Sequence, residues 1–474
     1  MANLPKSALL TETNMALFVD YYELTMGQAD FDSSQNAVCT ENYFARAIPQ
    51  GAYLIAAGLE QVIHYILNLR FSEDDLAWLQ SSKSIPEISP NFVDYLRNFK
   101  FDGDVYAVPE GTIVLPNEPI INITGRSIDV QLFETYLLSI MNFQTLIATK
   151  SSRIVNVSGG RICFDFGARR AHGRDAAILS ARASFIGGMS ATSLVIASQY
   201  FDIPYVGTLA HKFIQDRPSE LGAFRDYAMS FPHNTILLID TYDTIQGAKH
   251  AVTIGQEMRA KGQELRGVRL DSGNLLELSK QVRSILDDGD LKEAKIFASN
   301  DLDEFEIDRL LKSGAPLDGF GIGTRLATGA TFNPISGNGG VSALPGVYKH
   351  VEKIKGDQTI PTFKISNDTA KSTLPARKQV QRFTDPDQYY IKDQICLWDE
   401  IDQDGLLIPI VKRGELVYDF PTLKEIQVQT QNNVSSLPDK HKTLDQPATY
   451  PVTLSQKLEN LQQELINEKQ SNVS

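Results

Sequence analysis

Short apolar runs alternate with longer segments of helical periodicity between about residue 160 and residue 325. The apolar runs predict strands over 161–167, 204–210, 235–240, 267–271, 295–299 and 319–323. The segments between them predict helices over 176–200 (interrupted by Gly187 and Gly188), 245–261, 275–287 and 303–311. Strands that alternate with helices are typical of βαβ units and a parallel sheet. We therefore predict an α/β fold with an irregular, TIM-like βα barrel. A doubly wound open sheet remains the alternative, because periodicity does not separate the two.

The first 150 residues show a different pattern. Apolar positions at helical spacing predict a short helix within 12–31, an amphipathic helix over 51–69 and a buried helix over 127–150. Residues 105–125 form short β runs that are interrupted by Pro109, Pro116 and Pro119. Proline cannot donate to a β ladder, so we expect edge strands and turns of a small β module here.

The C-terminal part mixes short β runs with charged and polar stretches. Residues 326–345 are rich in Gly, Ala, Asn and Ser and predict a loop, whereas the β runs that follow could return to the first β module. Residues 432–450 are polar, and we expect them to be poorly ordered. A capping-box pattern over 453–456 precedes leucines at helical spacing and predicts a terminal helix. The predicted domains are 1–150, 151–345, 346–430 and the tail 431–474.

Composition narrows the classes of function. The chain has 474 residues, enough for two or three domains or for one barrel with additions. Its formal net charge of −13 argues against nucleic acid or an anionic membrane as the main partner. Cys39, Cys163 and Cys396 lie far apart and match neither a disulfide framework nor the spacing of a zinc site. We find no apolar leader segment and no run of 18 apolar residues, so we expect a cytoplasmic protein.

Polar residues that could carry chemistry lie where the predicted strands end. Active sites of βα barrels gather at the carboxyl ends of the strands, and His211 follows the second predicted strand. A neutral imidazole is well populated at pH 7, so His211 could act as a nucleophile, although a structural role is the common one for a single histidine. Arg169 and Arg170 follow the first strand, and adjacent arginines suit phosphate recognition.

The fourth, fifth and sixth strands add further candidates. Arg269 and Asp271 end the fourth strand, and Asp271 could hold a sugar diol or a metal, or could cap the next helix. Asn300 follows the fifth strand. Gly321, Gly323 and Thr324 offer backbone N–H groups that could bind a phosphate. This set suits an anionic sugar phosphate, and the sequence contains neither a dinucleotide-binding glycine motif after the first strand nor a Walker A motif.

Eight motifs in order resemble the nicotinate phosphoribosyltransferase family. They span 20–26, 52–59, 166–173, 207–211, 239–242, 267–273, 320–324 and 346–349. The resemblance implies an irregular α/β barrel of a type II phosphoribosyltransferase, with an α+β domain built from N-terminal and C-terminal segments. It also implies condensation of nicotinate with phosphoribosyl pyrophosphate (PRPP), coupled to ATP hydrolysis with Mg²⁺, which gives nicotinate mononucleotide and pyrophosphate. The family works as a homodimer with shared active sites.

The resemblance also assigns roles to the candidate residues. His211 is the residue that ATP phosphorylates. Tyr22, Thr208 and Arg269 match positions that hold nicotinate, with Tyr22 reaching in from the partner subunit. Gly323 and Thr324 match the site of the 5′-phosphate, and Arg169 and Asp271 fall where related transferases bind pyrophosphate, ribose or the ring. Arg170, Asn300 and Gly321 complete the expected PRPP set, whereas the metal ligands stay unassigned.

Two local features bear on the choice of substrate and on coupling. Related enzymes that use nicotinamide carry an acidic residue near the segment 187–190, which here contains Met189 and no carboxylate, so nicotinate is favoured. Lys212 follows the histidine where many relatives carry serine, so its ammonium could assist or disturb phosphoryl transfer. Three alternatives remain: a nicotinamide-using enzyme of the same architecture, a type I phosphoribosyltransferase suggested by residues 236–244, and a catalytically inactive nucleotide-binding regulator.

Overall fold

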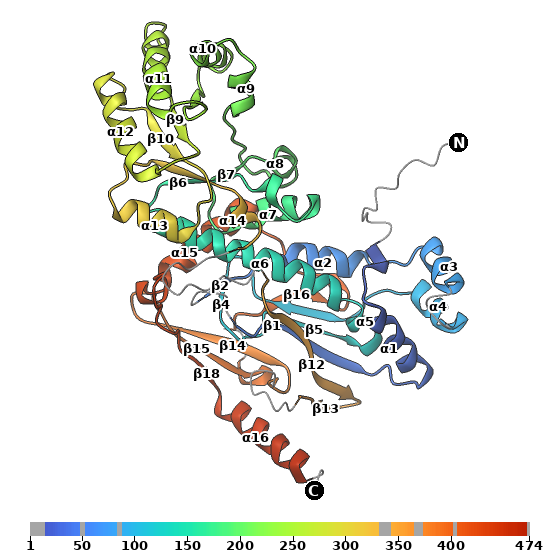
Figure 1. Ribbon diagram of the computed structural model, residues 1–474. Coiled ribbons are helices and arrows are strands. Elements are labelled where there is room, and N and C mark those ends of the chain that lie inside the picture. The colour runs from blue at the N-terminus through green and yellow to red at the C-terminus, as the bar shows by residue number, and fades with distance from the viewer. Residues whose placement is uncertain are drawn as a thin grey trace, which may run out of the picture.

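Two sheets, with one long helix between them, make up most of the molecule. The computed structural model describes residues 15–47, 53–82, 88–330, 343–364, 373–401 and 405–471. A parallel sheet with its helices occupies one end, and a larger antiparallel sheet occupies the other (Figure 1). The helix α6 (Glu134–Val157) crosses the middle of the molecule. The predicted domain boundary at residue 150 therefore falls inside a helix.

The parallel sheet is an incomplete barrel. Its six described strands are β6 (Ile162–Asp165), β7 (Ala191–Thr192), β8 (Ile236–Leu238), β9 (Gly267–Leu270), β10 (Lys295–Ala298) and β11 (Gly319–Ile322). They lie in the order β7-β6-β11-β10-β9-β8, so the last strand pairs with the first. Each of the other pairings joins strands that follow one another in the chain. This curled half-barrel confirms the predicted irregular βα barrel, and the open doubly wound alternative is wrong.

The stretch 174–210 differs from the prediction. Helix α7 (Arg174–Ile186) ends at Gly187, where an added Cβ would lie 2.3 Å from the carbonyl oxygen of Ala148. The chain then forms β7 and α8 (Val195–Phe201), so one predicted helix is in fact helix, strand and helix. The predicted strand over 204–210 makes only an isolated bridge, from Tyr205 to Thr192. That segment is a connection, and β7 takes its place in the sheet.

Side-chain caps begin the helices that follow the strands. Asp243, Asn274 and Asp303 accept backbone N–H groups at the starts of α11 (Thr244–Arg259), α12 (Leu275–Asp288) and α13 (Glu304–Lys312). Such caps satisfy N–H groups that have no partner within the helix. Each strand therefore turns into its helix within a few residues, and the polar residues of that turn stay at one rim of the half-barrel.

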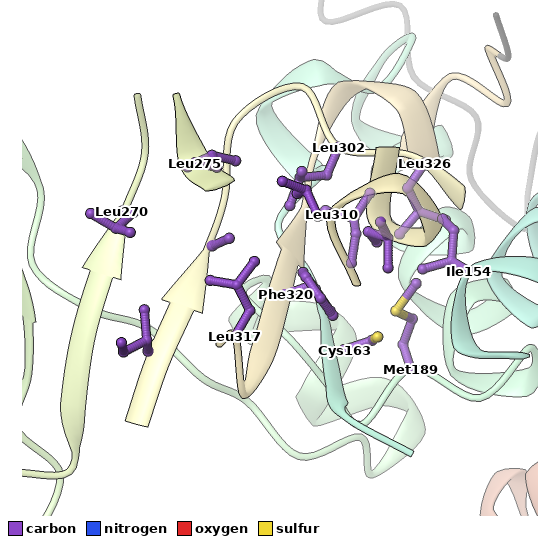
Figure 2. Close-up of a cluster of buried hydrophobic side chains, with 14 of the residues drawn as sticks. Ile154, Cys163, Met189, Leu270, Leu275, Leu302, Leu310, Leu317, Phe320 and Leu326 are labelled. Carbon is purple, nitrogen blue, oxygen red and sulfur yellow. The ribbon is translucent and has the colours of Figure 1, made fainter. Parts of the chain in front are cut away.

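The half-barrel packs against α6 through apolar side chains. Figure 2 shows Cys163 of β6 and Phe320 of β11 facing Ile154 of α6 and Met189, and all four are buried. Removing a side chain as large as Phe320 from water contributes about 1.5–3 kcal/mol. This packing fixes the half-barrel on the long helix that also borders the antiparallel sheet.

The antiparallel sheet combines the two ends of the chain. Its described strands are β1 (Val38–Ala45), β3 (Asp104–Ala107), β5 (Ile121–Arg126), β12 (Gly346–Lys355), β13 (Gln358–Pro361), β16 (Ile408–Lys412) and β17 (Glu415–Leu416). Their order is β13-β12-β1-β5-β3-β16-β17, which confirms an α+β domain built from N-terminal and C-terminal segments. The expectation of edge strands around residues 105–125 holds only in part. Pro109, Pro116 and Pro119 lie in connections, so β3 and β5 pair on both sides, whereas the short strand β4 (Ile113–Val114) has a paired neighbour on one side only.

The remaining elements surround these two sheets. The N-terminal helices are α1 (Tyr21–Asp32), α2 (Leu59–Asn68), α3 (Glu73–Ser81), α4 (Pro90–Arg97) and α5 (Ser127–Gln131). Strands β2 (Leu54–Ile55) and β4 (Ile113–Val114) pair with each other, and β14 (Lys378–Thr384), β15 (Tyr390–Leu397) and β18 (Val452–Leu454) form a further sheet. The expected amphipathic helix over 51–69 therefore begins only at Leu59.

The polar tail is ordered, contrary to expectation. Helix α15 (Leu423–Ser436) covers the start of the stretch 432–450, and the buried Asn433 donates to the carbonyl oxygen of Gly111 (2.8 Å). The terminal helix α16 (Gln456–Ser471) is present, but Ser455 caps it and Thr453 lies in β18. Most of the predicted 326–345 loop lies outside the described residues. Within the described ranges, we find no helix long and apolar enough to cross a membrane.

A buried ionic network joins the half-barrel to the N-terminal segment. The fully buried Arg182 of α7 donates to both carboxylate oxygens of Glu110 (2.9 and 2.7 Å), to Glu60 (2.7 Å) and to Gln144 (3.1 Å). Burial alone would raise the pKa of Glu110, but the charge and hydrogen bonds of Arg182 outweigh it and hold this pKa below its usual value. The stabilisation is therefore present above the ordinary pKa of a glutamate and is lost as the pH falls through the lowered value.

We expect Arg182→Met to lower the free energy of unfolding at pH 7 by about 3–5 kcal/mol, because Glu110 is then a buried charge without its partner. Arg225→Ala is the matched control, since Arg225 forms an exposed pair with Glu257 whose loss should change the stability far less. Denaturant unfolding of both variants measures the difference. Equal losses in the two variants would contradict this role of Arg182.

Candidate active site

His211 lies at the rim of the half-barrel with an accessible imidazole. It is the first residue of α9 (His211–Gln215), and its side chain is 40% exposed. Its Nδ1 lies 3.1 Å from Oγ1 of Thr241, which follows β8, and its Nε2 lies 3.7 Å from Oδ2 of Asp271, which follows β9. His211 is therefore not enclosed by apolar side chains, as a purely structural histidine would be. The ring is held on one side and open to a ligand.

Arg269 provides a mostly buried positive charge beside His211. It belongs to β9, its side chain is only 13% exposed, and its Nη1 donates to Oγ1 of Thr208 (2.5 Å). Burial lowers the pKa of Arg269, the nearby charge of Arg169 adds to this effect, and Asp271 and Asp240 oppose it. Its Nε is buried without a hydrogen-bond partner among the described residues. This guanidinium therefore retains donor capacity for an anionic ligand.

Neighbouring strand ends orient Asp271. Its backbone N–H donates to Oδ2 of Asp240 (3.0 Å), and the hydroxyl of Ser299 donates to its Oδ1. The same oxygen lies 3.8 Å from Nη2 of Arg269. Asp271 thus presents one carboxylate oxygen to the arginine and the other to His211.

Phe166 lies beneath Arg269, and Gly321 makes room for its ring. The guanidinium carbon of Arg269 lies 5.9 Å from the ring centroid, which is within the range of a cation–π contact. Gly321 is inside β11, and a Cβ added there would lie 2.4 Å from the ring. The missing side chain of Gly321 thus serves the packing of Phe166. Its expected part in PRPP binding stays a prediction.

We expect Gly321→Ala to lower the free energy of unfolding by about 1–3 kcal/mol, because the new methyl group displaces the ring of Phe166 in a packed site. Gly207→Ala is the control, since no heavy atom lies within 4 Å of the position its Cβ would take. The control should lose no more than about 0.5 kcal/mol. Denaturant unfolding compares the two, and an unaffected Gly321→Ala protein would contradict the close approach.

The candidate phosphoribosyl residues lie along the next part of the same rim. Gly323 and Thr324 follow β11, and Asn300 follows β10 with a φ of +93°, an uncommon conformation for a residue other than glycine. The adjacent Asp301 pairs with Arg325 (2.9 Å). A cavity of about 1300 Å³ is lined by Asn300, Asp301 and Arg325 together with residues of α13. Its volume is ample for a phosphorylated sugar, but Gly323, Thr324, His211 and Arg269 do not line it.

Three other predicted residues are placed differently. Arg169 and Arg170 are exposed on the short turn Ala168–Arg170, and only Arg169 is near enough to influence the pKa of Arg269. Tyr22 is on α1, which lies at the far side of the molecule from α9 (Figure 1). Within one chain Tyr22 does not join the site.

Lys212, whose effect on phosphoryl transfer was an open question, is 83% exposed and pairs with Asp216 on α9.

Four residues that complete this geometry lie in or beside motifs noted in the sequence but were not assigned a role in the site. Thr241, Ser299 and Asp240 hold His211 and Asp271 in place, and Phe166 lies under Arg269. Each lies at a strand end, which is the signal that identified Asp271. Hydroxyl and aromatic residues are too common at such positions for that signal to select them without coordinates.

Comparison with known proteins identifies relatives along almost the whole chain. The nicotinate phosphoribosyltransferase (NAPRTase) N-terminal domain matches residues 17–142, and the C-terminal domain of the same family matches residues 400–462. A nicotinate phosphoribosyltransferase of Mycobacterium tuberculosis (strain H37Rv) is 36% identical over 446 residues, which cover 94% of this chain and 92% of that protein. The enzyme of Bacillus subtilis (strain 168) is 36% identical over 490 residues, which cover 98% of this chain and 97% of the relative.

Solved structures agree with these relatives. The crystal structure of human nicotinic acid phosphoribosyltransferase has a TM-score of 0.82 and 26% sequence identity, and the match covers 95% of this chain and 100% of the human chain. A nicotinate-nucleotide pyrophosphorylase from Pyrococcus furiosus has a TM-score of 0.71 at 22% identity, which shows a shared fold alone. The rim that carries His211, Arg269 and Asp271 and the near full-length relatives lead to one conclusion: this chain belongs to the nicotinate phosphoribosyltransferase family.

Proposed function

We propose that this chain condenses nicotinate with PRPP, releases pyrophosphate, and couples this step of NAD synthesis to ATP hydrolysis through a phosphohistidine at His211. The observation that carries the proposal is the buried guanidinium of Arg269, with unused donor capacity, beside an accessible histidine at the half-barrel rim. The membership of this chain in the nicotinate phosphoribosyltransferase family supports the same proposal.

Arg269 and Thr208 provide a site for the carboxylate of nicotinate. A carboxylate neutralises the buried guanidinium and forms charge-assisted hydrogen bonds, whereas the amide of nicotinamide leaves that charge unbalanced. Phe166 offers an aromatic face beside the same guanidinium. We therefore propose a preference for the acid over the amide, set chiefly by Arg269.

The phosphoribosyl group of PRPP would lie along the rim from Asn300 to Thr324. Backbone N–H groups near Gly323 and Thr324 would bind the 5′-phosphate, and Arg169 and Arg170 would meet the pyrophosphate. Cleavage at the anomeric carbon leaves positive charge on the ribosyl centre and negative charge on the departing pyrophosphate. Losing one preorganised donor in such a site typically costs about 3 kcal/mol in the barrier.

His211 is suited to accept a phosphoryl group. When Nδ1–H donates to Oγ1 of Thr241, Nε2 carries the lone pair that can attack the terminal phosphorus of ATP, and ADP leaves with the electrons of the broken P–O bond. Water then attacks the phosphohistidine, which releases phosphate and restores the imidazole. Asp271, 3.7 Å from Nε2, keeps the ring oriented between these steps.

The residues at the rim also fit Mg²⁺, which prefers oxygen ligands. Oδ1 of Asp240 is buried without a hydrogen-bond partner in the described part of the chain, and Asp271 lies next to it. We propose that these two carboxylates hold the ion. When bound, Mg²⁺ would neutralise phosphate charge on ATP and PRPP.

The active form would be a homodimer in the cytoplasm, with Tyr22 of one subunit completing the nicotinate site of the other. Tyr21, Tyr22 and Met26 expose large apolar surface on α1, which is unusual for side chains of this kind unless a partner covers them. The proposal needs no contact with nucleic acid or membrane.

An assay of pyrophosphate release tests the proposal. We expect release from nicotinate plus PRPP in the presence of Mg²⁺, a higher rate when ATP is added, and little release when nicotinamide replaces nicotinate. Faster release with nicotinamide would reject the choice of substrate. A complete lack of release with either base, from folded protein, would reject the reaction.

A further inference from the structure

Three potential metal ligands meet in the antiparallel sheet, far from the half-barrel rim. Cys39 and Glu41 belong to β1 and His350 belongs to the neighbouring strand β12. One donor atom of each residue lies within 4.8 Å of the other two, and among the described residues no other group of three histidine, cysteine or acidic residues meets this condition. The sequence did not indicate the group, because its members come from opposite ends of the chain.

Strand geometry places all three side chains on one face. Residues two apart on a strand point to the same side of a sheet, which holds for Cys39 and Glu41. His350 is the direct cross-strand partner of Glu41, and directly opposed residues also share a face. The register shifts between Thr40 and Glu41, so Val351 of β12 has no opposite residue. This bulge sets His350 opposite Glu41.

His350 has one satisfied and one unsatisfied ring nitrogen. Its Nδ1 lies 2.8 Å from Oε1 of Glu41, whereas its Nε2 is buried without a hydrogen-bond partner among the described residues. A metal ion that replaces the proton between Nδ1 and Oε1 would be bound by both groups at once, as a shared site requires.

We propose that Cys39, Glu41 and His350 form a site for Zn²⁺ or a similar borderline transition metal ion. A set of one sulfur, one carboxylate and one imidazole suits Zn²⁺, whereas Mg²⁺ and Ca²⁺ require oxygen ligands. Three protein ligands leave a fourth position for water. Coordination by Cys39 breaks its S–H bond, and the proton passes to solvent while the sulfur electron pair binds the metal.

The surroundings agree with a cation that enters from solvent. Cys39 is 1% exposed and lies at the bottom of the site, whereas the side chain of His350 is 31% exposed and forms its opening. The side chain of Glu41 is only 12% exposed, so a divalent cation would offset part of the cost of desolvating its carboxylate. The nearby Glu134 is already paired with Lys349 (3.4 Å), so it does not compete for the ion.

The site would bind β12, from the C-terminal part of the chain, to β1, from the N-terminal part. Within one chain its ligands lie on a different sheet from the half-barrel rim, so metal content and the transferase rate are separate measurements. The proposal and the proposed function can fail independently.

Cobalt spectroscopy on the full-length protein tests the site. We expect chelator-treated wild-type protein to bind one equivalent of Co²⁺ with a sulfur-to-cobalt charge-transfer band, and we expect Zn²⁺ to displace it. Cys39→Ser should abolish the band, whereas Cys396→Ser, which alters another buried cysteine, should keep it. Glu41→Gln and His350→Gln should each weaken Zn²⁺ binding by about tenfold or more.

If a variant fails to fold, as judged by circular dichroism, the charge-transfer band of the wild-type protein still tests the proposal. Only a cysteine ligand produces the charge-transfer band, so wild-type protein without it would overturn the proposal. A band that survives in folded Cys39→Ser protein would also overturn it, because the sulfur ligand would then be Cys163 or Cys396.

Discussion

Replacing His211 by asparagine should reduce ATP hydrolysis by at least about 10³-fold and should remove the stimulation of pyrophosphate release by ATP. Asparagine retains a donor near Thr241 but offers no ring nitrogen that can accept a phosphoryl group. The measurement is the rate of ADP formation with saturating nicotinate and PRPP. His233→Asn is the matched control, since His233 is exposed and lies at the opposite end of β8.

The control should hydrolyse ATP at the wild-type rate. If His211→Asn protein also did so while remaining folded, the phosphoryl acceptor would have to be another group. His250 pairs with Glu220 (2.7 Å) on the helices outside the half-barrel, so it is not placed to take over this role.

The second large effect concerns the carboxylate of nicotinate. Arg269→Ala should lower kcat/KM for nicotinate by about 2–5 kcal/mol in transition-state stabilisation, which is roughly 30-fold to several-thousand-fold. The loss has two parts: the ligand loses its cationic partner, and Asp271 loses a neighbouring positive charge. Steady-state kinetics of pyrophosphate release at several nicotinate concentrations measures it.

Arg266→Ala provides the control for Arg269→Ala. Arg266 immediately precedes β9, at the end away from the rim, where its side chain donates to the carbonyl oxygen of His233 (3.1 Å). Its removal should leave nicotinate kinetics within about twofold of wild type. If Arg269→Ala protein discriminated between nicotinate and nicotinamide as well as wild type does, another group would have to bind the carboxylate.

The regular part of the fold could be predicted because its strands are short buried runs between capped helices. The runs at 235–240, 267–271, 295–299 and 319–323 correspond to β8, β9, β10 and β11 with ends shifted by one or two residues. The run at 204–210 is equally apolar, yet only Tyr205 forms a bridge. A strand requires a neighbour that is free to pair, and no single segment carries that information.

The prediction of a poorly ordered tail was wrong because it rested on polar composition alone. Residues 432–450 contain few apolar side chains, but His441 is buried and its Nδ1 lies 2.6 Å from the carbonyl oxygen of Ala448. Asn433 is buried in a similar way against Gly111. Polar groups can be buried when each finds a hydrogen-bond partner, and such partners become visible only in three dimensions.

The candidate site was largely predictable because its residues lie at the ends of successive strands. The structure brings Thr208, His211, Arg269 and Asp271 together through direct contacts. Tyr22 could not be tested in this way, since α1 of the same chain lies far from the rim. The metal ligands of the antiparallel sheet could not be predicted, because they depend on a one-residue shift between β1 and β12.

Mapping of phosphate on the protein during ATP turnover tests the central claim most directly. We predict that protein incubated with ATP and Mg²⁺, and analysed at alkaline pH by tandem mass spectrometry, carries an acid-labile phosphate on His211. This phosphate should disappear when ATP is exhausted. Phosphate on a different residue, or none on the protein while ADP accumulates, would contradict the account.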